Sequence, residues 1–312
     1  FLGYAEDKWD GLVEYLSSRK VPLDLAAEIG VVKKREGGGY YDFFRHRIVF
    51  PVITPGYNDG GELCGRGVAF SGRTFGEPKT SEGREPPAKY LNSPDSLIYH
   101  KSHTMYGLNV AADAVRKNDF VVLVEGNLDV MRLHQAGIEN TVAPLGTALT
   151  SGHVKLLGRY TRNFVVVFDG DEAGRKAAAR SLPIFLEADV VPRVVVLPMG
   201  EDPDSFVRKN GGEGFRSMIK EASTLFEWII DDMAAKLGHG TDGKVRVVEE
   251  LKPYFEMVRN PVEMALYSRR LAQRLSLEES VLIPMFSRRQ KTREEAGVKP
   301  KADTVEKTIL EL

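Results

Sequence analysis

Cysteine is almost missing from this sequence: Cys64 is the only one in 312 residues. A single thiol can form neither an internal disulfide nor a multi-cysteine zinc site, so neither crosslink stabilises this chain from within. We interpret Cys64 as a small apolar residue and expect a reducing cytoplasm as its compartment.

The sequence also lacks long apolar runs and a secretory signal. No stretch approaches the roughly 20 apolar residues that a membrane-spanning helix needs, so we expect no membrane role. An initiating methionine is missing too. The opening Phe1-Leu2-Gly3-Tyr4 is typical of the middle of a fold, which predicts an excised fragment.

A strong charge of one sign is absent. The formal net charge is −1, which excludes a chain-wide attraction for nucleic acid. The charges are nevertheless uneven: residues 33–117 carry 13 Lys and Arg against 9 Asp and Glu, and residues 119–212 carry 10 against 12. A basic front half beside an acidic centre suits a protein that grips phosphates and holds metal cations.

The front half predicts a mixed α+β subdomain. Residues 6–34 have apolar side chains at helical spacing and are predicted to be helical. Residues 47–53 and 63–70 read as two strands joined by a hairpin turn at 57–61, and residues 74–88 as a loop.

From residue 119, apolar runs alternate with helical periodicity. Helices joining the strands imply parallel pairing, so the predicted fold class is α/β, with a parallel sheet covered by helices on both faces. Strands are predicted at 120–124, 141–143, 164–168 and 193–197, with helices at 128–135, 151–160 and 172–186.

After about residue 222, only helical periodicity remains. Helices are predicted at 225–237, 244–257 and 262–275, and the Lys-, Glu- and Thr-rich tail from 288 reads as a linker. We therefore expect a basic α+β subdomain, a parallel α/β domain, a helical subdomain and a linker, at 1–118, 119–221, 222–290 and 291–312.

Carboxylates follow three of the predicted strands. Glu125 follows the first strand, Asp169 and Asp171 follow the third, and Asp202 and Asp204 follow the fourth. The carboxyl ends of parallel strands form the ligand-binding edge of such sheets, and strand residues two apart point to the same side. We therefore expect these acids to converge.

Clustered carboxylates repel one another unless cations bind between them. Mg²⁺ prefers hard oxygen ligands, and a pair of such ions can stabilise both oxygens of a phosphoryl transfer. Gly126 and Gly170 each follow an acid and are expected to let the chain turn tightly. The pattern predicts a Mg²⁺ site, although a lone Asp-Gly-Asp also suits a turn, and Asp202 and Asp204 also suit helix N-caps.

These residues resemble the Toprim domain, which occurs in DnaG-type primases, topoisomerases and several nucleases. The resemblance implies Mg²⁺ and phosphodiester chemistry without deciding the reaction. It is carried by Val124-Glu125-Gly126, by Asp129 and by Phe168-Asp169-Gly170-Asp171-Glu172-Ala173-Gly174-Arg175.

The flanks resemble the catalytic core of DnaG-type primases, in the same order from residue 1 to about 220. They include the segments at 1–5, 39–42, 44–47, 71–73, 87–94, 106–108, 151–157 and 197–204. In one departure, the family's usual Glu-Gly-Tyr-Met-Asp has Asn127 in place of Tyr, and we expect a mild effect.

This resemblance implies DNA-templated synthesis of short RNA primers from NTPs on single-stranded DNA, with Mg²⁺ as cofactor and Mn²⁺ as a substitute. Glu125 is implied to assist deprotonation of the primer 3′-hydroxyl. The implied catalytic and metal-binding residues are Glu125, Asp169 and Asp171, completed by Asp202, Asp204 and Asp129.

The resemblance also implies a groove that holds nucleotide, template and nascent RNA. Taken singly, the charged members also suit a solvated surface, and Tyr90 suits either a stacked base or the core. The implied binding residues are Arg45, Arg47, Arg66, Arg73, Lys89, Tyr90, Asn92 and Lys101.

Parts of the family's architecture are expected to lie outside this chain. The resemblance implies that zinc belongs only to an absent N-terminal domain, and that the replicative helicase contacts an absent C-terminal domain. The core is expected to be monomeric and to work in the cytoplasm at the replication fork.

Two other functions stay open at this point. Another Toprim enzyme would cleave DNA as a nuclease or topoisomerase, but no separate tyrosine-bearing domain and no P-loop is visible. A non-catalytic Toprim scaffold would only bind nucleic acid, but retention of every acidic position argues against it.

Overall fold

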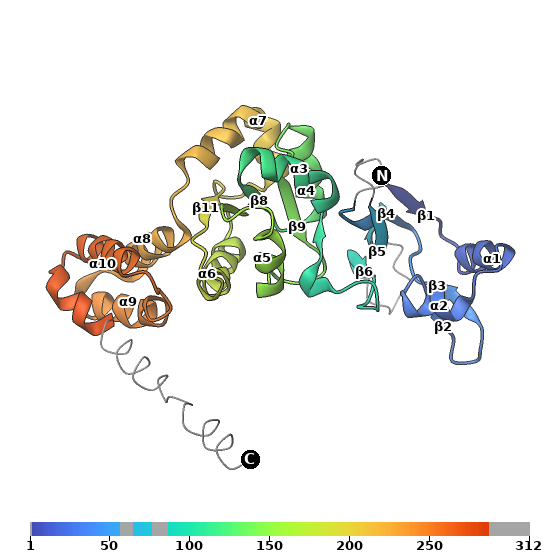
Figure 1. The fold of residues 1–312 in the computed structure, drawn as a ribbon, viewed down its shortest axis with the longest axis horizontal. Helices are drawn as coiled ribbons and strands as arrows, with labels where there is room; N and C mark the ends of the chain where they lie inside the picture. The colour runs from blue at the N-terminus through green and yellow to red at the C-terminus, as the bar shows by residue number, and fades with distance from the viewer. Residues whose placement is uncertain (1, 57–64, 77–86, 287–312) are drawn as a thin grey trace, which may run out of the picture. The chain divides into compact units, whose positions relative to one another are not determined.

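The computed structural model describes residues 2–56, 65–76 and 87–286 (Figure 1). The chain divides into two compact units, Phe1–Ser223 and Thr224–Leu312. No helix of the described residues is long and apolar enough to cross a membrane. The predicted hairpin turn at 57–61, Cys64, most of the predicted loop at 74–88 and nearly all of the tail from 288 lie outside the described residues.

An antiparallel sheet forms the front of the first unit. Its strands lie in the order β1 (Gly3–Ala5), β4 (Arg47–Thr54), β5 (Arg66–Thr74) and β6 (Tyr90–Asn92). The two predicted strands are confirmed as β4 and β5. The short strand β6 pairs with β5, and Asn92 lies opposite Ser71 in that pair.

Residues 6–34 are only partly helical. They hold α1 (Gly11–Ser18) and α2 (Leu23–Glu28), whereas β2 (Val32–Lys34) pairs with β3 (Tyr40–Asp42) in a separate small sheet. The buried Asp42 carboxylate accepts hydrogen bonds from the backbone N–H groups of Leu12 at 2.7 Å and Val13 at 3.0 Å. The helical prediction is wrong at 32–34, because antiparallel pairing decides the conformation there.

The second sheet has the predicted parallel core. Its order is β11-β10-β8-β9-β7, with four parallel strands and a two-residue antiparallel edge strand, β7, which the sequence did not predict. The strands are β7 (Met105–Tyr106), β8 (Val121–Leu123), β9 (Thr141–Pro144), β10 (Phe164–Phe168) and β11 (Arg193–Val196).

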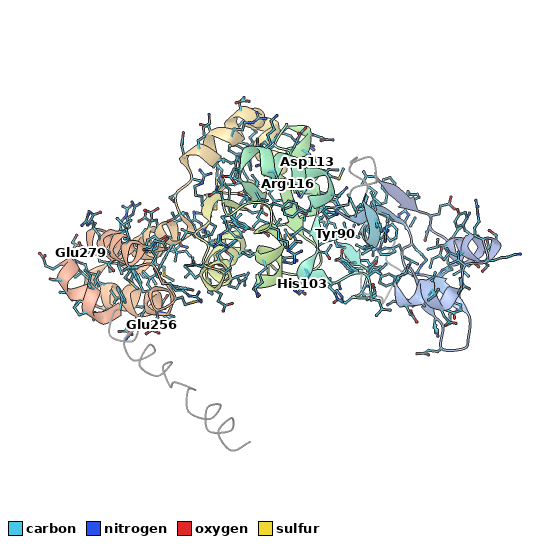
Figure 2. The ribbon with its side chains drawn as sticks, in the orientation of Figure 1. Tyr90, His103, Asp113, Arg116, Glu256 and Glu279 are labelled. Carbon is cyan, nitrogen blue, oxygen red and sulfur yellow. The ribbon has the colours of Figure 1, made fainter. Side chains whose placement is uncertain are left out.

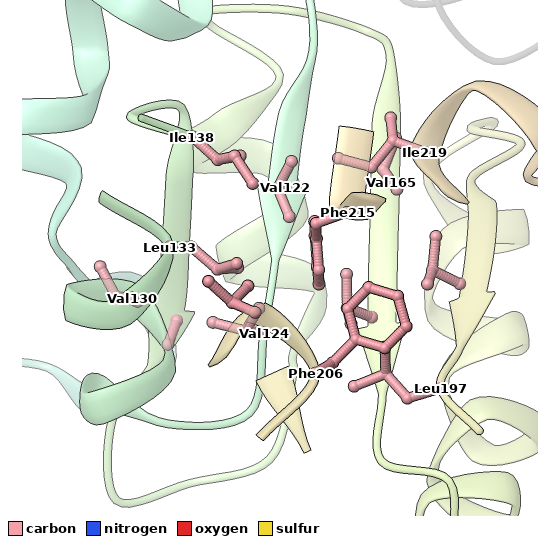
Figure 3. Close-up of a cluster of buried hydrophobic side chains, with 14 residues drawn as sticks. Val122, Val124, Val130, Leu133, Ile138, Val165, Leu197, Phe206, Phe215 and Ile219 are labelled. Carbon is pink, nitrogen blue, oxygen red and sulfur yellow. The ribbon is translucent and has the colours of Figure 1, made fainter. Parts of the chain in front are cut away.

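Helices cover both faces of this sheet, which confirms the α/β fold class. On one face, α4 and α7 pack through a cluster of buried apolar side chains, including Leu133, Val165 and Phe215 (Figure 3). On the other face, Phe185 of α6 packs edge-on against Phe164, with ring centroids 5.7 Å apart. The helices of this region are α3 (Leu108–Asn118), α4 (Asn127–Gln135), α5 (Ser151–Leu157), α6 (Glu172–Glu187) and α7 (Pro203–Glu221), with the short 3-10 helix η1 (Lys101–His103) before β7.

The carboxyl ends of β10 and β11 are joined tightly. The backbone N–H of Gly170 donates to the carbonyl of Glu201 at 3.0 Å, and a Cβ atom at Gly170 would lie 1.8 Å from the carbonyl oxygen of Pro198. Gly170 is therefore required by close approach of backbone to backbone. Gly126, by contrast, has extended backbone and makes no tight turn.

The second unit is helical, as predicted. It holds α8 (Leu225–Leu237), α9 (Gly240–Phe255) and α10 (Pro261–Leu275). Its core is aromatic: the ring of Phe226 lies 5.0 Å from that of Phe255 and 4.5 Å from that of Tyr267.

Asp202 is the N-cap of α7 and Thr224 is the N-cap of α8. Each side chain accepts a hydrogen bond from the backbone N–H three residues further along the chain.

Candidate active site

A pocket of about 820 Å³ lies where β5 and β6 meet the carboxyl ends of β8 and β10. Tyr90, labelled in Figure 2, belongs to the β6 wall. The pocket is lined by Ser71, Arg73, Lys89, Tyr90, Asn92, Glu125, Gly126, Asn127, Leu128, Asp129, Met131, Arg132, Gln135, Leu145, Gly146, Asp169, Asp202, Asp204 and Arg208.

Asp129 lies in the first turn of α4 and at the centre of the acidic wall. Its Oδ2 accepts a hydrogen bond from the backbone N–H of Gly126 at 3.0 Å. Burial raises the pKa of Asp129 to about 7, and the charges of Asp169, Asp202 and Glu125 act in the same direction. The predicted supporting residue thus lies near enough to three other acids for their charges to act on it.

Glu125 and Asp169 continue this wall at the ends of β8 and β10. Glu125 keeps an exposed surface, yet the protein atoms around its carboxylate remove part of its hydration. This burial, followed by the charges of Asp169 and Asp171, raises the pKa of Glu125. Burial and then the charges of Asp202 and Asp171 raise the pKa of Asp169. A bound cation would offset the repulsion between these carboxylates.

Asp171 and Asp202 are helix N-caps. Asp171 Oδ1 accepts from the backbone N–H of Gly174 at 2.7 Å, and Asp202 Oδ1 accepts from that of Ser205 at 2.7 Å. The bond from Ser205 lowers the pKa of Asp202, which keeps this carboxylate charged. Asp171 is exposed and does not line the pocket, although its charge acts on Glu125.

Asp204 is held by two arginines. Arg132 of α4 donates from Nε to its Oδ1, and Arg208 Nη2 lies 3.1 Å from its Oδ2. The carboxylate therefore enters the pocket already neutralised, unlike the other acids. The structure gives Asp204 an arginine-binding environment where the sequence analysis expected a metal ligand.

The opposite wall carries cations and hydrogen-bonding groups. Arg73, Lys89, Tyr90 and Asn92 all line the pocket, as the resemblance implied. The guanidinium carbon of Arg73 lies 5.8 Å from the centroid of the half-buried Tyr90 ring. Burial raises the pKa of Tyr90, and Arg73 opposes that rise.

Arg47 does not reach the pocket. It is 5% exposed, and its guanidinium donates to the backbone carbonyls of Gly72, Ala88 and Lys89 at 3.0, 2.8 and 3.3 Å. The strand register turns Arg47 inward, so its observed contacts join β5 to the segment before β6. A phosphate-binding position for this residue is not what the structure shows.

Three other predicted binding residues also lie outside the pocket wall. The guanidinium of Arg45 lies 3.8 Å from the ring centroid of Trp9, and Arg66 is exposed at the start of β5. The backbone of Lys101 is fixed from both sides: its N–H donates to Asp95 Oδ1 at 2.7 Å, and its carbonyl lies 2.6 Å from His153 Nε2.

The acidic residues suit a metal ion by their chemistry more than by their present geometry. Among the described residues, no three His, Cys, Asp or Glu side chains converge closely enough to hold an ion as they stand. The carboxylates nevertheless supply the hard oxygen atoms that Mg²⁺ prefers. Burial and, after it, repulsion between the acids raise the pKa values of Glu125, Asp129 and Asp169, and a cation would offset the repulsion. The donor atoms of these residues therefore fit a divalent cation, although the side chains do not converge on one point.

Several residues that line the pocket were not among the predicted site residues. Arg132 lies three residues after Asp129 on α4, and Arg208 lies four residues after Asp204 on α7, so helical spacing could have placed both. Ser71 and Asn127 belong to segments that carried the resemblance, but neither was predicted to bind a ligand, because nothing in one sequence shows that a small polar residue is buried in a pocket wall. The polar residues among them are Ser71, Asn127, Arg132, Gln135 and Arg208.

Three family models match the chain in order. Residues 1–112 match "DNA primase catalytic core, N-terminal domain", residues 122–207 match "Toprim-like", and residues 226–280 match "DnaB-helicase binding domain of primase". The fold and the site thus define a Toprim-containing protein. The third match corrects the expectation that the helicase-binding module lies wholly outside this chain.

The DNA primase of Clostridium acetobutylicum is 33% identical over 92% of this chain, which spans 45% of that protein. A DNA primase domain from Pseudomonas aeruginosa superimposes with a TM-score of 0.74 at 34% identity, covering 92% of this chain and 86% of that structure. The zinc-binding and RNA polymerase domains of Aquifex aeolicus primase give 0.71 at 32% identity, covering 90% and 64%.

The chain belongs to the DnaG-type primase family, and the resemblance read from the sequence is confirmed. It spans about half the length of the curated relatives that it matches, 45% and 48% of the first two.

Proposed function

We propose that this chain carries the nucleotidyl-transfer site of a DnaG-type primase and joins ribonucleotides 5′ to 3′ into an RNA primer on single-stranded DNA. One observation supports this most: the acids at the strand ends face Arg73 and Lys89 across a single pocket. A nucleoside triphosphate needs both walls, because cations held by the acids and the basic side chains neutralise different phosphates.

Toprim primases as a family use divalent metal, and we propose Mg²⁺ for this chain, with Mn²⁺ as a substitute. When bound, the ions supply positive charge at the attacking and leaving oxygens. Glu125, Asp169 and Asp202 would hold them. The solved structure of Aquifex aeolicus primase comprises a zinc-binding domain and an RNA polymerase domain, and we propose that zinc belongs to a domain of the former kind.

The remaining acids take positioning roles in this proposal. Asp129 holds the backbone of Gly126 at the start of α4, and Asp171 fixes the start of α6. Asp204 orients Arg132 and Arg208 toward the pocket. Glu125, whose pKa burial raises, is suited to accept the proton of the primer 3′-hydroxyl.

Single-stranded DNA is the proposed template. A solved structure of the DnaG primase catalytic domain bound to ssDNA is 31% identical and covers 87% of this chain. We propose that the pocket wall of Arg73, Lys89, Tyr90 and Asn92 holds nucleotide and primer terminus. Arg45, Arg66 and Lys101 would contact only nucleic acid that extends beyond the pocket.

The helical unit is proposed to contact the replicative helicase, since residues 226–280 match the DnaB-binding family model. On α10, Val262 and Leu266 are 64% and 56% exposed and lie four residues apart, which gives an apolar stripe for such a contact. Leu266→Asp should weaken binding of the replicative helicase in fluorescence anisotropy, and unchanged affinity would remove this stripe from the proposal.

We also propose that the domains are 1–118, 119–221, 222–290 and 291–312, and that the core is monomeric. Limited proteolysis should cut first near these boundaries. Light scattering should give the mass of one chain, 34.7 kDa.

A primer-extension assay tests the proposed activity without requiring initiation. An RNA primer annealed to single-stranded DNA is incubated with the chain, NTPs and Mg²⁺ or Mn²⁺. We expect extension by the wild type and a loss of at least about 100-fold in Asp169→Asn, because that carboxylate belongs to the proposed metal site. Lys155→Ala, on exposed α5 surface, is the matched control and should extend normally.

The products separate the alternatives. Cleavage of the DNA strand without RNA extension would support the nuclease function, and binding without either product would support the scaffold. Full extension by Asp169→Asn would overturn the proposed metal site itself.

A further inference from the structure

The pocket contains buried polar groups whose hydrogen-bonding capacity is unused. In the described part of the chain, five buried side-chain atoms lack a hydrogen-bond partner, and three of them belong to residues lining this one pocket. They are Ser71 Oγ, Asn92 Oδ1 and Asn127 Nδ2. Ser71 is 0% exposed and Asn127 2% exposed, so water does not freely solvate them from outside.

A buried donor or acceptor without a partner costs stability, and folded chains rarely keep several together without a use. Here Asn92 offers an acceptor, Asn127 offers a donor, and Ser71 offers either. Asn92 and Ser71 are fixed beside each other by the β5–β6 register. The fitting ligand group must therefore both donate and accept, as a hydroxyl does.

The position of these atoms decides which part of a nucleotide they meet. Asn127 is two residues from Glu125 and begins α4, directly beside the acidic wall that would hold the metal and the triphosphate. The sugar is the part of a nucleotide joined directly to that phosphate chain, whereas the base lies further away. The sugar hydroxyls are thus the groups within reach of Asn127.

We propose that Ser71, Asn92 and Asn127 form a subsite for the ribose 2′-hydroxyl of the incoming nucleotide, so that this chain selects ribonucleotides over deoxyribonucleotides. The subsite rests on the proposed function, because it assumes a nucleotide in this pocket. A deoxynucleotide would leave the same buried atoms without partners, and a site built to bind a hydroxyl rejects the analogue that lacks it.

Equilibrium binding without template tests this apart from catalysis. Dissociation constants for ATP and 2′-deoxy-ATP are measured with Mg²⁺ by calorimetry for the wild type, Ser71→Ala and Asn127→Leu, the last of which keeps the side-chain volume. We expect each variant to bind ATP about 3- to 10-fold more weakly while its affinity for 2′-deoxy-ATP stays the same. Lys155→Ala, on the exposed surface of α5 and outside the pocket lining, should keep the wild-type preference.

Thermal unfolding of the nucleotide-free variants supplies a second readout. Because Ser71→Ala removes an unpaired buried hydroxyl, its Tm should equal or exceed that of the wild type even as ATP affinity falls. A residue with a purely structural role would lower both.

The possible outcomes distinguish a failure of the proposed function from a failure of the subsite alone. A wild-type chain that binds no nucleotide overturns the proposed function along with the subsite. A wild-type chain that binds ATP and 2′-deoxy-ATP equally, or variants that lose affinity for both in parallel, overturns the subsite alone.

Discussion

Arg132 on α4 forms an ion pair with Asp204 on α7, 72 residues further along the chain. The pair joins two helices that pack on the same face of the parallel sheet, at the rim of the pocket. The positive charge of Arg132 therefore lies beside the acidic residues and weakens their attraction for a metal ion.

Arg132→Met is expected to strengthen metal binding modestly. With its arginine removed, Asp204 keeps only Arg208, and the acidic wall becomes more negative. Because the pair is about one-third exposed, the effect should be small, about 2- to 5-fold in the Mn²⁺ dissociation constant measured by calorimetry. Arg116→Met, at an ion pair outside the pocket, is the control. Weaker Mn²⁺ binding by Arg132→Met would mean that this arginine supports the metal site.

Asp169→Asn should raise the Tm of the metal-free protein. Burial and the charges of Asp202 and Asp171 raise the pKa of Asp169, so its ionised form destabilises the fold at neutral pH and the neutral amide does not. Mn²⁺ should then raise the Tm of the wild type but not that of the variant. Calorimetry with and without Mn²⁺ measures both effects, and equal Mn²⁺ stabilisation of the two proteins would contradict the prediction.

Arg47→Met should destabilise the first unit without a specific loss of nucleotide affinity. The substitution leaves three backbone carbonyls without their donor, at a cost of about 2–4 kcal/mol. Urea denaturation measures this loss. Arg73→Met provides the contrast: it should leave stability nearly unchanged and weaken ATP binding. The reverse pattern would return Arg47 to the binding site.

Lys89 and Lys101 should differ in the salt dependence of DNA binding. If Lys89 contacts a phosphate in the pocket, Lys89→Ala should reduce the slope of log affinity against log salt by about 0.7 for a short single strand. Lys101 lies outside the pocket wall, so Lys101→Ala should leave that slope unchanged for a strand of four nucleotides or so. Anisotropy titrations at several salt concentrations decide this, and equal slope changes would place both lysines in one groove.

Asp231 should make the second unit sensitive to acid. Burial alone would raise the pKa of Asp231, but hydrogen bonds from Arg270 and Arg274 outweigh it and leave the pKa lowered. A lowered folded pKa gives stability that is present above the unfolded pKa, near 4, and that disappears as pH falls through the folded value.

Asp231→Asn should therefore cost about 1 kcal/mol at pH 7 and much less at pH 3. The chain has two tryptophans, so a Trp9→Phe background leaves Trp228 on α8 as the fluorescent reporter of this unit. A cost that is the same at both pH values would show that the ion pairs contribute nothing.

The sequence predicted the parallel sheet well because its strands are buried on both faces. Val165 and Val167 pack toward α7, while Phe164 packs toward α6, so the run from 164 to 168 is apolar throughout. The position of the acids followed from topology, since parallel strands bring their carboxyl ends to one edge. That rule alone was enough to predict that Glu125 and Asp169 lie at the same edge of the sheet.

The remaining parts of the site depend on contacts that no local pattern encodes. The sequence alone indicates that Arg47 is a surface charge on a strand. Only the pairing of β4 with β5 brings its guanidinium to the carbonyl of Gly72. The sequence around Asp204 indicates a metal ligand, and only the structure shows that Arg132 of another helix pairs with it. The small edge strand β7 and the pairing of β2 with β3 likewise arise from partners that are distant or too short to give a periodic signal.

Gly170 sets how far apart the two acid-bearing loops can be. Its missing side chain lets the loop after β10 press against Pro198, and its N–H ties it to Glu201, three residues before the acid at Asp204. Any larger residue would act as a wedge that drives Asp169 away from Asp202, widening the gap that an ion must bridge. The distance between these two carboxylates therefore depends on the absence of a Cβ atom at Gly170.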